Sequence, residues 1–134
     1  MAAVAPVVVV AVGQPPVVDV PVVPDGPAAY FTTLPVKACV AAIRAAGVPA
    51  SVSHTAGTYV CNQVFYGLMH LLATEFPGTR GGFVHVPFSP EQVAAAEKGE
   101  TSLSVDRIAD ALEALVDTAL RVTKDLGVSA GAEH

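Results

Sequence analysis

The sequence predicts an α/β domain, in the form of a three-layer α/β/α sandwich with a parallel or mixed central sheet. The first observation is that strand-like runs alternate along the chain with segments of helical period, which is the order expected of a parallel sheet with crossover helices. The second is size, because 134 residues suit a single domain and a hydrophobic share of 52% supplies a core. Right-handed crossovers would place helices on both faces of the sheet.

Residues 1–25 form a Val/Pro-rich segment that differs from the rest of the chain. Eleven of the first 23 residues are valine, and five prolines fall within the segment. A continuous β-branched run is typical of a buried strand, which we expect at Val7–Val12. The prolines that follow remove ladder donors, so Gly13–Asp25 is expected to be an extended loop. An exposed valine tract would favour aggregation, so this segment is either buried or not native sequence.

The next elements are helical. Apolar spacing predicts a first helical piece from Pro27 to Leu34, which Pro35 interrupts. A second piece is expected from about Pro35 to Ala46, with Gly47 ending it in the left-handed conformation. A short strand follows at Ala50–His54.

Gly57 then allows a sharp turn into a long helix that runs from about Thr58 or Val60 to Glu75. Helical spacing predicts that this helix buries Val60, Val64, Leu68, Leu71 and Leu72. The run Gly81–Phe88 is rich in strand formers and is expected to be the next strand.

Two more helices complete the domain, which we expect to span residues 26–126 and to be followed by a flexible tail at 127–134. Ser89 caps the first helix with Pro90 at its first position, and Gly99 breaks it. The last helix begins at Ser104. Its amphipathic stripe consists of Val105, Ile108, Leu112, Leu115 and Leu120.

Composition and charge exclude several classes of protein. A net charge of −5, scattered basic residues and the absence of tryptophan argue against nucleic acid as a partner. The apolar run Ala2–Val12 has eleven residues, too few to cross a membrane, and it lacks the charged start of a secretory signal. Two cysteines do not make a disulfide framework, so we expect a reducing, cytoplasmic setting.

Cys61 and His85 are the candidate catalytic pair. Cys61 lies where a strand turns into a helix, and His85 lies 24 positions later in the next strand-like run (85 minus 61). The carboxyl ends of parallel strands share one edge of a sheet, so the two side chains can meet there as a nucleophile and its base. The helix start would favour a thiolate, and the backbone N–H groups of Cys61 and Asn62 could stabilise an oxyanion. A buried, structural cysteine is the alternative, and it is the favoured interpretation for Cys39.

The remaining histidines are interpreted as structural. His70 lies two and a half helical turns beyond Cys61, so it points elsewhere, while His54 is expected near the surface and His134 is terminal. No His-x-x-x-His or Cys-x-x-Cys spacing occurs in the sequence, so we expect no metal site.

Three segments, in order, resemble the pyroglutamyl peptidase family of cysteine peptidases, which remove an N-terminal pyroglutamate from peptides. The segment Ser53–Gly67 is similar to the family's cysteine motif, Gly82–Gln92 to its histidine motif, and Gly26–Pro35 to a further family segment. The resemblance covers most of the chain from Gly26 to about Leu120.

The resemblance implies a mechanism that needs no cofactor. Cys61 would attack the carbonyl that follows the pyroglutamyl ring, and His85 would take the thiol proton and later protonate the leaving amine. A thioester acyl-enzyme would form and then be hydrolysed. Tyr59 and Val60 would contribute to the ring pocket. Peptides with an N-terminal pyroglutamate are the implied partners, and a homo-oligomer is the implied assembly.

One departure from the family lies at the start of the chain. Family members carry N-terminal strands, a Gly-Phe-x-Pro-Phe loop, a glutamate that orients the histidine and an arginine near the oxyanion, none of which can be placed here. We therefore expect an N-terminally truncated relative. Two alternatives stay open: an inactive relative serving as an interaction or scaffold domain, and a different cysteine hydrolase in which Asp19 or Glu91 orients His85.

Overall fold

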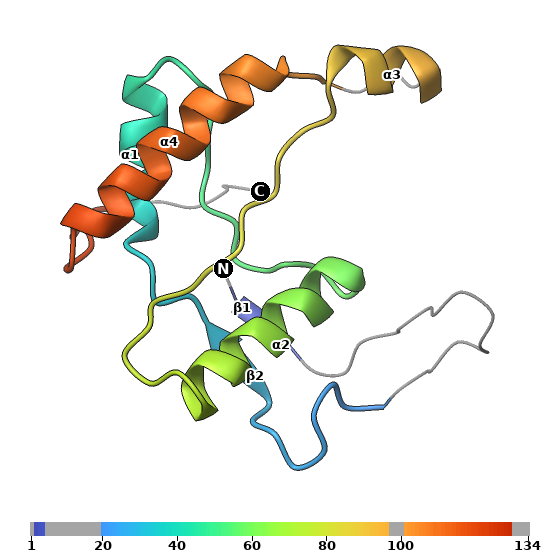
Figure 1. Cartoon of the computed structure of the whole chain (residues 1–134), viewed down its shortest axis with the longest axis vertical. Coiled ribbons are helices and arrows are strands. Elements are labelled where there is room, and N and C mark those ends of the chain that lie inside the picture. The colour runs from blue at the N-terminus through green and yellow to red at the C-terminus, as the bar shows by residue number, and fades with distance from the viewer. Residues whose placement is uncertain (1, 5–19, 97–100, 130–134) are drawn as a thin grey trace. The chain divides into compact units, whose positions relative to one another are not determined.

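The computed structural model describes residues 2–4, 20–96 and 101–129. The elements follow in the order β1 (Ala2–Val4), β2 (Ala29–Phe31), α1 (Val36–Ala45), α2 (Val60–Thr74), α3 (Pro90–Ala96) and α4 (Val105–Arg121) (Figure 1). The chain divides into two compact units. Among the described residues, unit 1 holds those up to Leu34 and Val52–Phe83, and unit 2 holds Pro35–Ser51 and those from Val84 onward.

The core of unit 1 forms on one face of α2. Phe65, Tyr66 and Met69 are buried there at 0%, 0% and 4% exposure, and Asn62 is fully buried one turn earlier. Residues three and four apart share a face of a helix, so these side chains form a continuous stripe. The partly buried side chains packed against the stripe are Val22, Val23, Tyr30, Ala56, Leu72 and Phe83.

Two tyrosines fasten the segment before α1 onto α2. The Tyr66 hydroxyl donates to the Pro27 carbonyl at 2.6 Å, and its ring meets that of Tyr30 edge-to-face at 5.1 Å. Burial of the ring, together with the nearby Tyr30, raises the pKa of Tyr66. The Tyr30 hydroxyl lies 2.9 Å from His70 Nδ1. A Cβ on Gly26 would come within 2.5 Å of the Tyr66 hydroxyl oxygen, so the chain needs glycine at this close approach.

The two described strands form a small antiparallel sheet against which α2 lies (Figure 1). Ala2 pairs with Phe31 and Val4 with Ala29. The prediction of a helical piece from Pro27 to Leu34 is wrong, because β2 occupies its centre. The prolines at both ends leave fewer than two turns between them, and pairing with β1 together with the packing of Tyr30 outweighs the apolar spacing.

Helix α1 is the buried element of unit 2. It lies beside α4 and buries Ala38, Cys39 and Ile43 at 7%, 4% and 7% exposure, as expected for a structural Cys39 (Figure 1). The Cys39 thiol lies 3.7 Å from the Leu115 carbonyl oxygen on α4. Gly47 ends the helix with φ +77°, which confirms its predicted role.

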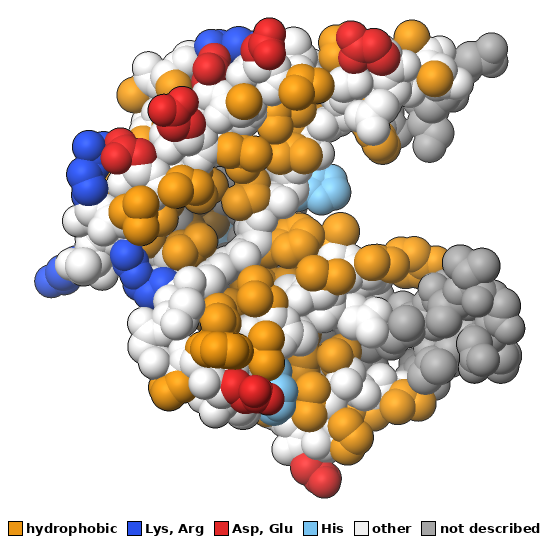
Figure 2. Space-filling model, viewed as in Figure 1, with side chains coloured by type: hydrophobic (Ala, Val, Ile, Leu, Met, Phe, Trp, Pro, Cys, Tyr) orange, Lys and Arg blue, Asp and Glu red, His pale blue; other side chains and the backbone are white. Residues whose placement is uncertain are grey.

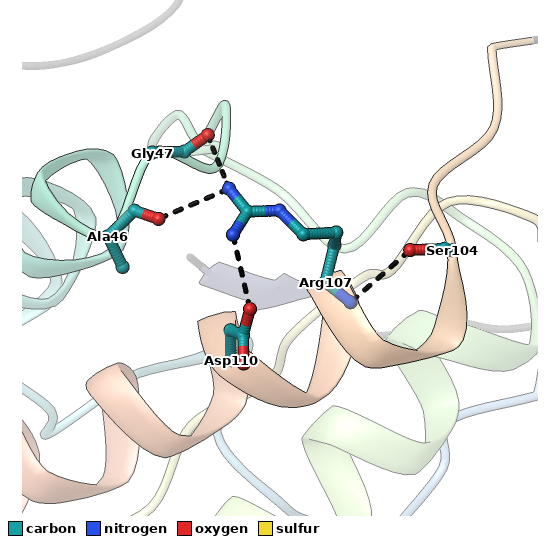
Figure 3. A network of polar contacts seen from close by, with 5 residues as sticks. All are labelled: Ala46, Gly47, Ser104, Arg107 and Asp110. Carbon is teal, nitrogen blue, oxygen red and sulfur yellow. Dashed lines mark hydrogen bonds and ion pairs between the residues drawn. The ribbon is translucent and has the colours of Figure 1, made fainter.

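Side chains from elsewhere in unit 2 cap both ends of α1. Its first turn has no acidic residue and Pro35 makes no side-chain cap, but the Asp125 carboxylate accepts from the N–H groups of Lys37 at 3.1 Å and Ala38 at 2.9 Å. At the other end, Arg107 Nη2 donates to the carbonyls of Ala46 at 3.2 Å and Gly47 at 2.8 Å (Figure 3). Both contacts place a charge of the favourable sign at a helix end.

The predicted starts of the last two helices are confirmed. Ser89 Oγ accepts from the Gln92 N–H and the Gln92 side chain accepts from the Ser89 N–H, which is a reciprocal capping box. Ser104 Oγ accepts from the Arg107 N–H at the start of α4 (Figure 3). The long helix is confirmed as well, since α2 runs from Val60 to Thr74.

The predicted strands at Ala50–His54 and Gly81–Phe88 are wrong as strands of this structure. Neither segment forms a ladder with another described part of the chain, and Phe88 makes only a single parallel bridge with Ser102. Strand-forming residues become a strand only when a partner supplies hydrogen bonds. Gly81 does lie beside the end of β2, where its carbonyl accepts from the Thr33 N–H at 3.0 Å.

The buried faces of two helices also differ from those predicted. On α2, Val60, Val64, Leu68 and Leu71 are exposed by 37–55% and Leu72 is half-buried, because the bulkier aromatic stripe takes the core. On α4, Ile108 and Leu115 are half-buried, whereas Val105, Leu112 and Leu120 are exposed by 65%, 38% and 74%. Along α4, apolar side chains lie beside a row of acidic and basic side chains (Figure 2). The apolar face of α4 is wider than the area that α1 contacts, so part of that face stays exposed.

The predicted strand at Val7–Val12 and the break at Gly99 lie outside the described residues. Across the described ranges, no helix is both long enough and apolar enough to span a lipid bilayer.

The Asp125 cap makes the stability of unit 2 depend on pH. Burial by itself would raise the pKa of Asp125, but the N–H donors of Lys37, Ala38 and Leu126 and the Lys37 charge lower it below its usual value. A carboxyl group with a lowered pKa stabilises the fold above its unfolded pKa of about 3.9, and this stabilisation is lost as pH falls through the folded value. Urea unfolding at pH 7 should show Asp125→Asn less stable by about 1–2 kcal/mol, with the difference shrinking below about pH 4. A difference that stays constant down to pH 2 would contradict this role.

The Arg107 cap predicts a contrast between two arginines of α4. Arg107→Met removes both donations to the end of α1 and should lower the free energy of unfolding by about 1 kcal/mol. Arg121→Met is the matched control. Arg121 is 70% exposed, and among the residues that the structure describes it pairs with Asp117 alone, on its own helix, so its loss should change stability by less than about 0.5 kcal/mol. Equal urea midpoints for the two variants would show that the cap adds nothing.

Candidate active site at the start of α2

A polar loop leads the chain into α2. Ser53 Oγ donates to the Thr55 carbonyl at 2.8 Å, and Thr55 Oγ1 accepts from the Gly57 N–H at 3.0 Å. Gly57 adopts φ +82° with open space around it, so backbone conformation rather than crowding requires glycine there. These bonds fix the turn that delivers residues 59–62 to the helix start.

The N-terminus of α2 lacks a side-chain cap. Tyr59 is its N-cap residue in extended conformation, and the Tyr59 side chain makes no cap hydrogen bond. The first turn has no acidic residue either. In contrast, the first-turn N–H groups of α1, α3 and α4 donate to the side chains of Asp125, Ser89 and Ser104, respectively. Neither the N-cap residue nor the first turn therefore supplies an anion to the positive end of the α2 dipole.

Four of the predicted site residues lie together at this helix start. Cys61 is the second residue of α2 and is partly exposed. Asn62 is fully buried beside it, and within the described residues no buried side-chain polar atom lacks a partner. Tyr59 and Val60 are 61% and 48% exposed on the same turn. A reactive group bound at Cys61 would thus meet an apolar rim and a helix N-terminus.

His85 belongs to unit 2, within the extended segment that follows Phe83, and its side chain is exposed. Cys61 belongs to unit 1. The pairing of the thiol with the imidazole stays a prediction.

Cys39, His54 and His70 lie in the surroundings that the sequence predicts for them. Cys39 is buried in α1, and His54 is exposed. His70 contacts Tyr30 through Nδ1 and stacks on the Tyr66 ring at 6.5 Å. Among the residues that the structure describes, no group of three or more potential ligands could hold a metal ion.

Sequence reasoning missed two contributors to this region. The hydroxyls of Ser53 and Thr55 shape the loop, whereas the sequence analysis predicts the turn from Gly57 alone. The signal was present, because Ser-x-Thr-x-Gly places side-chain oxygens two residues before backbone N–H groups, which is typical of hydroxyl-closed turns. The burial of Asn62 was not foreseen, since an amide in an apolar stripe gives no such signal.

Comparison with known proteins identifies relatives over most of the chain. A model of the family described as pyroglutamyl peptidase matches residues 5–122. A pyrrolidone-carboxylate peptidase of Streptomyces coelicolor is 60% identical over 124 residues, which are 91% of this chain and 56% of that protein. One from Escherichia fergusonii is 56% identical over 117 residues, 87% of this chain and 54% of that protein. The chain thus spans little more than half the length of these relatives.

Solved structures agree with these relatives. Pyroglutamyl peptidase I from Bacillus amyloliquefaciens matches with a TM-score of 0.79 and 44% identity, over 87% of this chain and 54% of that one. Pyrrolidone carboxyl peptidase from Thermococcus litoralis matches with a TM-score of 0.83 and 30% identity, over 96% and 63%. The predicted α/β fold class is confirmed by this likeness.

The two thiols should differ in reactivity. Cys61 is partly exposed at a helix start, whereas Cys39 is 4% exposed beneath α4. Iodoacetamide at pH 7 should modify Cys61 at least tenfold faster in the folded chain, as followed by peptide mass spectrometry. In urea the two rates should converge. Similar rates in the folded chain would mean that the α2 start does not present its thiol to solvent.

Proposed function

This chain belongs to the pyroglutamyl peptidase family, and on that premise we propose that it hydrolyses the bond after an N-terminal pyroglutamyl residue of peptides. The observation that carries the proposal is the position of Cys61, which stands partly exposed in the first turn of α2, close to an N-cap residue, Tyr59, that makes no side-chain cap. That setting presents a thiol nucleophile beside backbone N–H donors, and the proposed reaction needs no cofactor.

The proposed reaction is a two-step acyl transfer. The Cys61 sulfur attacks the carbonyl carbon of the pyroglutamyl residue after His85 accepts the thiol proton. The C–N bond then breaks, His85 returns the proton to the leaving amine, and a thioester remains on Cys61. A water molecule, deprotonated by His85, attacks the thioester and releases pyroglutamate and the thiol.

The start of α2 also supplies a site for the negative charge of the tetrahedral intermediate. We assign that role to the backbone N–H groups of Cys61 and Asn62, because first-turn N–H groups point along the axis toward the helix start. Burial of the Asn62 side chain holds this turn against the core of unit 1. Donors that are fixed before the reaction cost no reorganisation when the charge develops.

Tyr59 and Val60 are the proposed contacts for the pyroglutamyl ring. The lactam is uncharged, so a pocket for it needs apolar walls and amide-type hydrogen bonds. Both residues expose apolar surface on the turn that carries Cys61, and their backbone groups lie next to the nucleophile in sequence. A charged side chain is not needed for recognition.

The setting and assembly of the chain are part of the same proposal. Neither Cys39 nor Cys61 forms a disulfide, which supports a reducing, cytoplasmic location. Homo-oligomerisation is supported by the apolar side chains that α4 exposes, namely Leu112, Val116 and Leu120.

A fluorogenic pyroglutamyl amide tests the activity directly. Release of the fluorophore by the wild-type chain should fall to background in Cys61→Ala, because the other thiol of the chain, Cys39, is buried and cannot replace it as the nucleophile. Cys39→Ala is the matched control and should retain turnover within about twofold, since Cys39 is buried in α1 of unit 2. His85→Gln should lose about 10²–10⁴ in kcat.

The opposite result is equally definite. If the wild-type chain and Cys61→Ala release the fluorophore at the same slow rate, the chain does not carry out the proposed reaction. If His85→Gln is as active as wild type, another group is the base.

A further inference from the structure

Two threonine hydroxyls hold the chain at Gly81, four residues before His85 (85 minus 81). The Gly81 carbonyl accepts from the hydroxyls of Thr32 at 2.9 Å and Thr33 at 3.3 Å. The Gly81 N–H in turn donates to Thr33 Oγ1 at 2.8 Å. We call these side-chain bonds to Gly81 the threonine clamp. Side chains thus hold both polar backbone groups of Gly81, in addition to the bond from the Thr33 N–H.

The threonine clamp is closely packed on the side of Thr32. Gly81 is buried, and a Cβ on Gly82 would come within 2.5 Å of Thr32 Oγ1 and 2.6 Å of Leu34 Cδ1. Thr32 Oγ1 also accepts from the Leu34 N–H at 3.2 Å, so it cannot move aside without losing hydrogen bonds. A side chain at position 82 would therefore open the clamp, which explains the glycine there.

Phe83, which follows the clamped glycines, is anchored in the core of unit 1. Its ring centroid lies 6.1 Å from that of Phe65, and it packs against the buried face of α2. Phe83 is the last residue of unit 1 before His85, and the side chains of Val84–Phe88 are all exposed. His85 follows two residues after Phe83, and two residues of extended chain span at most about 7 Å. The freedom of His85 therefore depends on how firmly Phe83 is held.

We propose that Thr32 is a positioning residue for His85, the base of the proposed reaction. This inference rests on the proposed function, which assigns proton transfer to His85. A general base acts only within hydrogen-bond reach of the proton that it takes, and small misplacements of a reacting group lower the rate strongly. Thr32 acts through Gly81, because its half-buried hydroxyl ties the residue after β2 to the segment that leads to His85. Thr33 supports the same contact from a more exposed side chain.

A double-mutant cycle in the full chain tests this role with the fluorogenic pyroglutamyl amide. Thr32→Val keeps the shape of the side chain and removes its hydroxyl, so kcat per folded molecule should fall about tenfold while KM changes by less than about twofold. In a His85→Gln background the same change should cost less than about twofold, because no base is left to position.

Two control variants separate positioning from a general effect on the fold. Thr32→Ser restores the hydroxyl and should recover kcat to within about twofold of the wild-type chain. Thr79→Val makes the same chemical change two residues before Gly81, on an exposed side chain, and should behave like wild type.

A second readout needs no turnover. The amide order parameter of Phe83, from nitrogen-15 relaxation, should fall by about 0.1 from a rigid value of about 0.85 in Thr32→Val, and should stay unchanged in Thr32→Ser and Thr79→Val. An unchanged value in Thr32→Val would overturn the proposal.

The kinetic outcomes distinguish this proposal from the proposed function. If the wild-type chain turns over and Thr32→Val matches it, or loses the same factor with and without His85, the positioning role is overturned and the proposed function stands. If the wild-type chain is no faster than Cys61→Ala, both are overturned together.

Discussion

Unit 1 depends on the burial of Tyr66, whose hydroxyl donates to the Pro27 carbonyl at 2.6 Å. A buried hydroxyl without a partner costs about 1–3 kcal/mol, so the bond and the burial of the ring require one another. Because the ring belongs to α2 and the carbonyl to the segment before β2, this single contact ties the helix to the sheet. Phe65 and Met69 extend the same face. The start of α2, with its thiol, is held in place by side chains one to two turns further along the helix.

The four described helices differ in how the N–H groups of their first turns are capped. The helix whose N-cap side chain makes no cap and that borrows no carboxylate, α2, carries the candidate site. α3 and α4 begin with their own serines, and α1 borrows the carboxylate of Asp125. The N-cap residue of α2, Tyr59, makes no side-chain cap. An absent cap costs a helix about 0.5–2 kcal/mol, and α2 can bear that cost because fifteen residues and an aromatic core stabilise it. The first-turn N–H groups of α2 point toward the helix start, where they can stabilise the anion of the reaction proposed at Cys61.

The starts of α1 to α4 were predictable from this sequence to within a residue or two, because local chemistry determines them, whereas the helical piece expected at Pro27–Leu34 did not form. Ser89-Pro90, Ser104 and Gly47 each act through bonds or dihedral angles within one turn. The faces that helices bury were less predictable, since the choice depends on partners. α2 carries one stripe of Val64 and Leu68 and another of Phe65 and Met69, and packing against β2 selects the second. The double capping of α1 joins residues 60 to 88 positions apart, which no local pattern reveals.

The predicted strands at Ala50–His54 and Gly81–Phe88 are wrong for a different physical reason, which also concerns the candidate site. A helix satisfies its backbone internally, whereas a strand depends on hydrogen bonds from elsewhere, so strand propensity reports only a capacity to pair. Gly81 uses that capacity beside Thr33, and Phe88 uses it beside Leu103, while the residues between them do not. His85 lies within this unpaired stretch. A ladder on both sides of an imidazole fixes the direction in which it points, and a base must be held within hydrogen-bond reach of its thiol. The strand propensity of the five residues from Val84 to Phe88 therefore does not by itself fix the direction of the His85 ring.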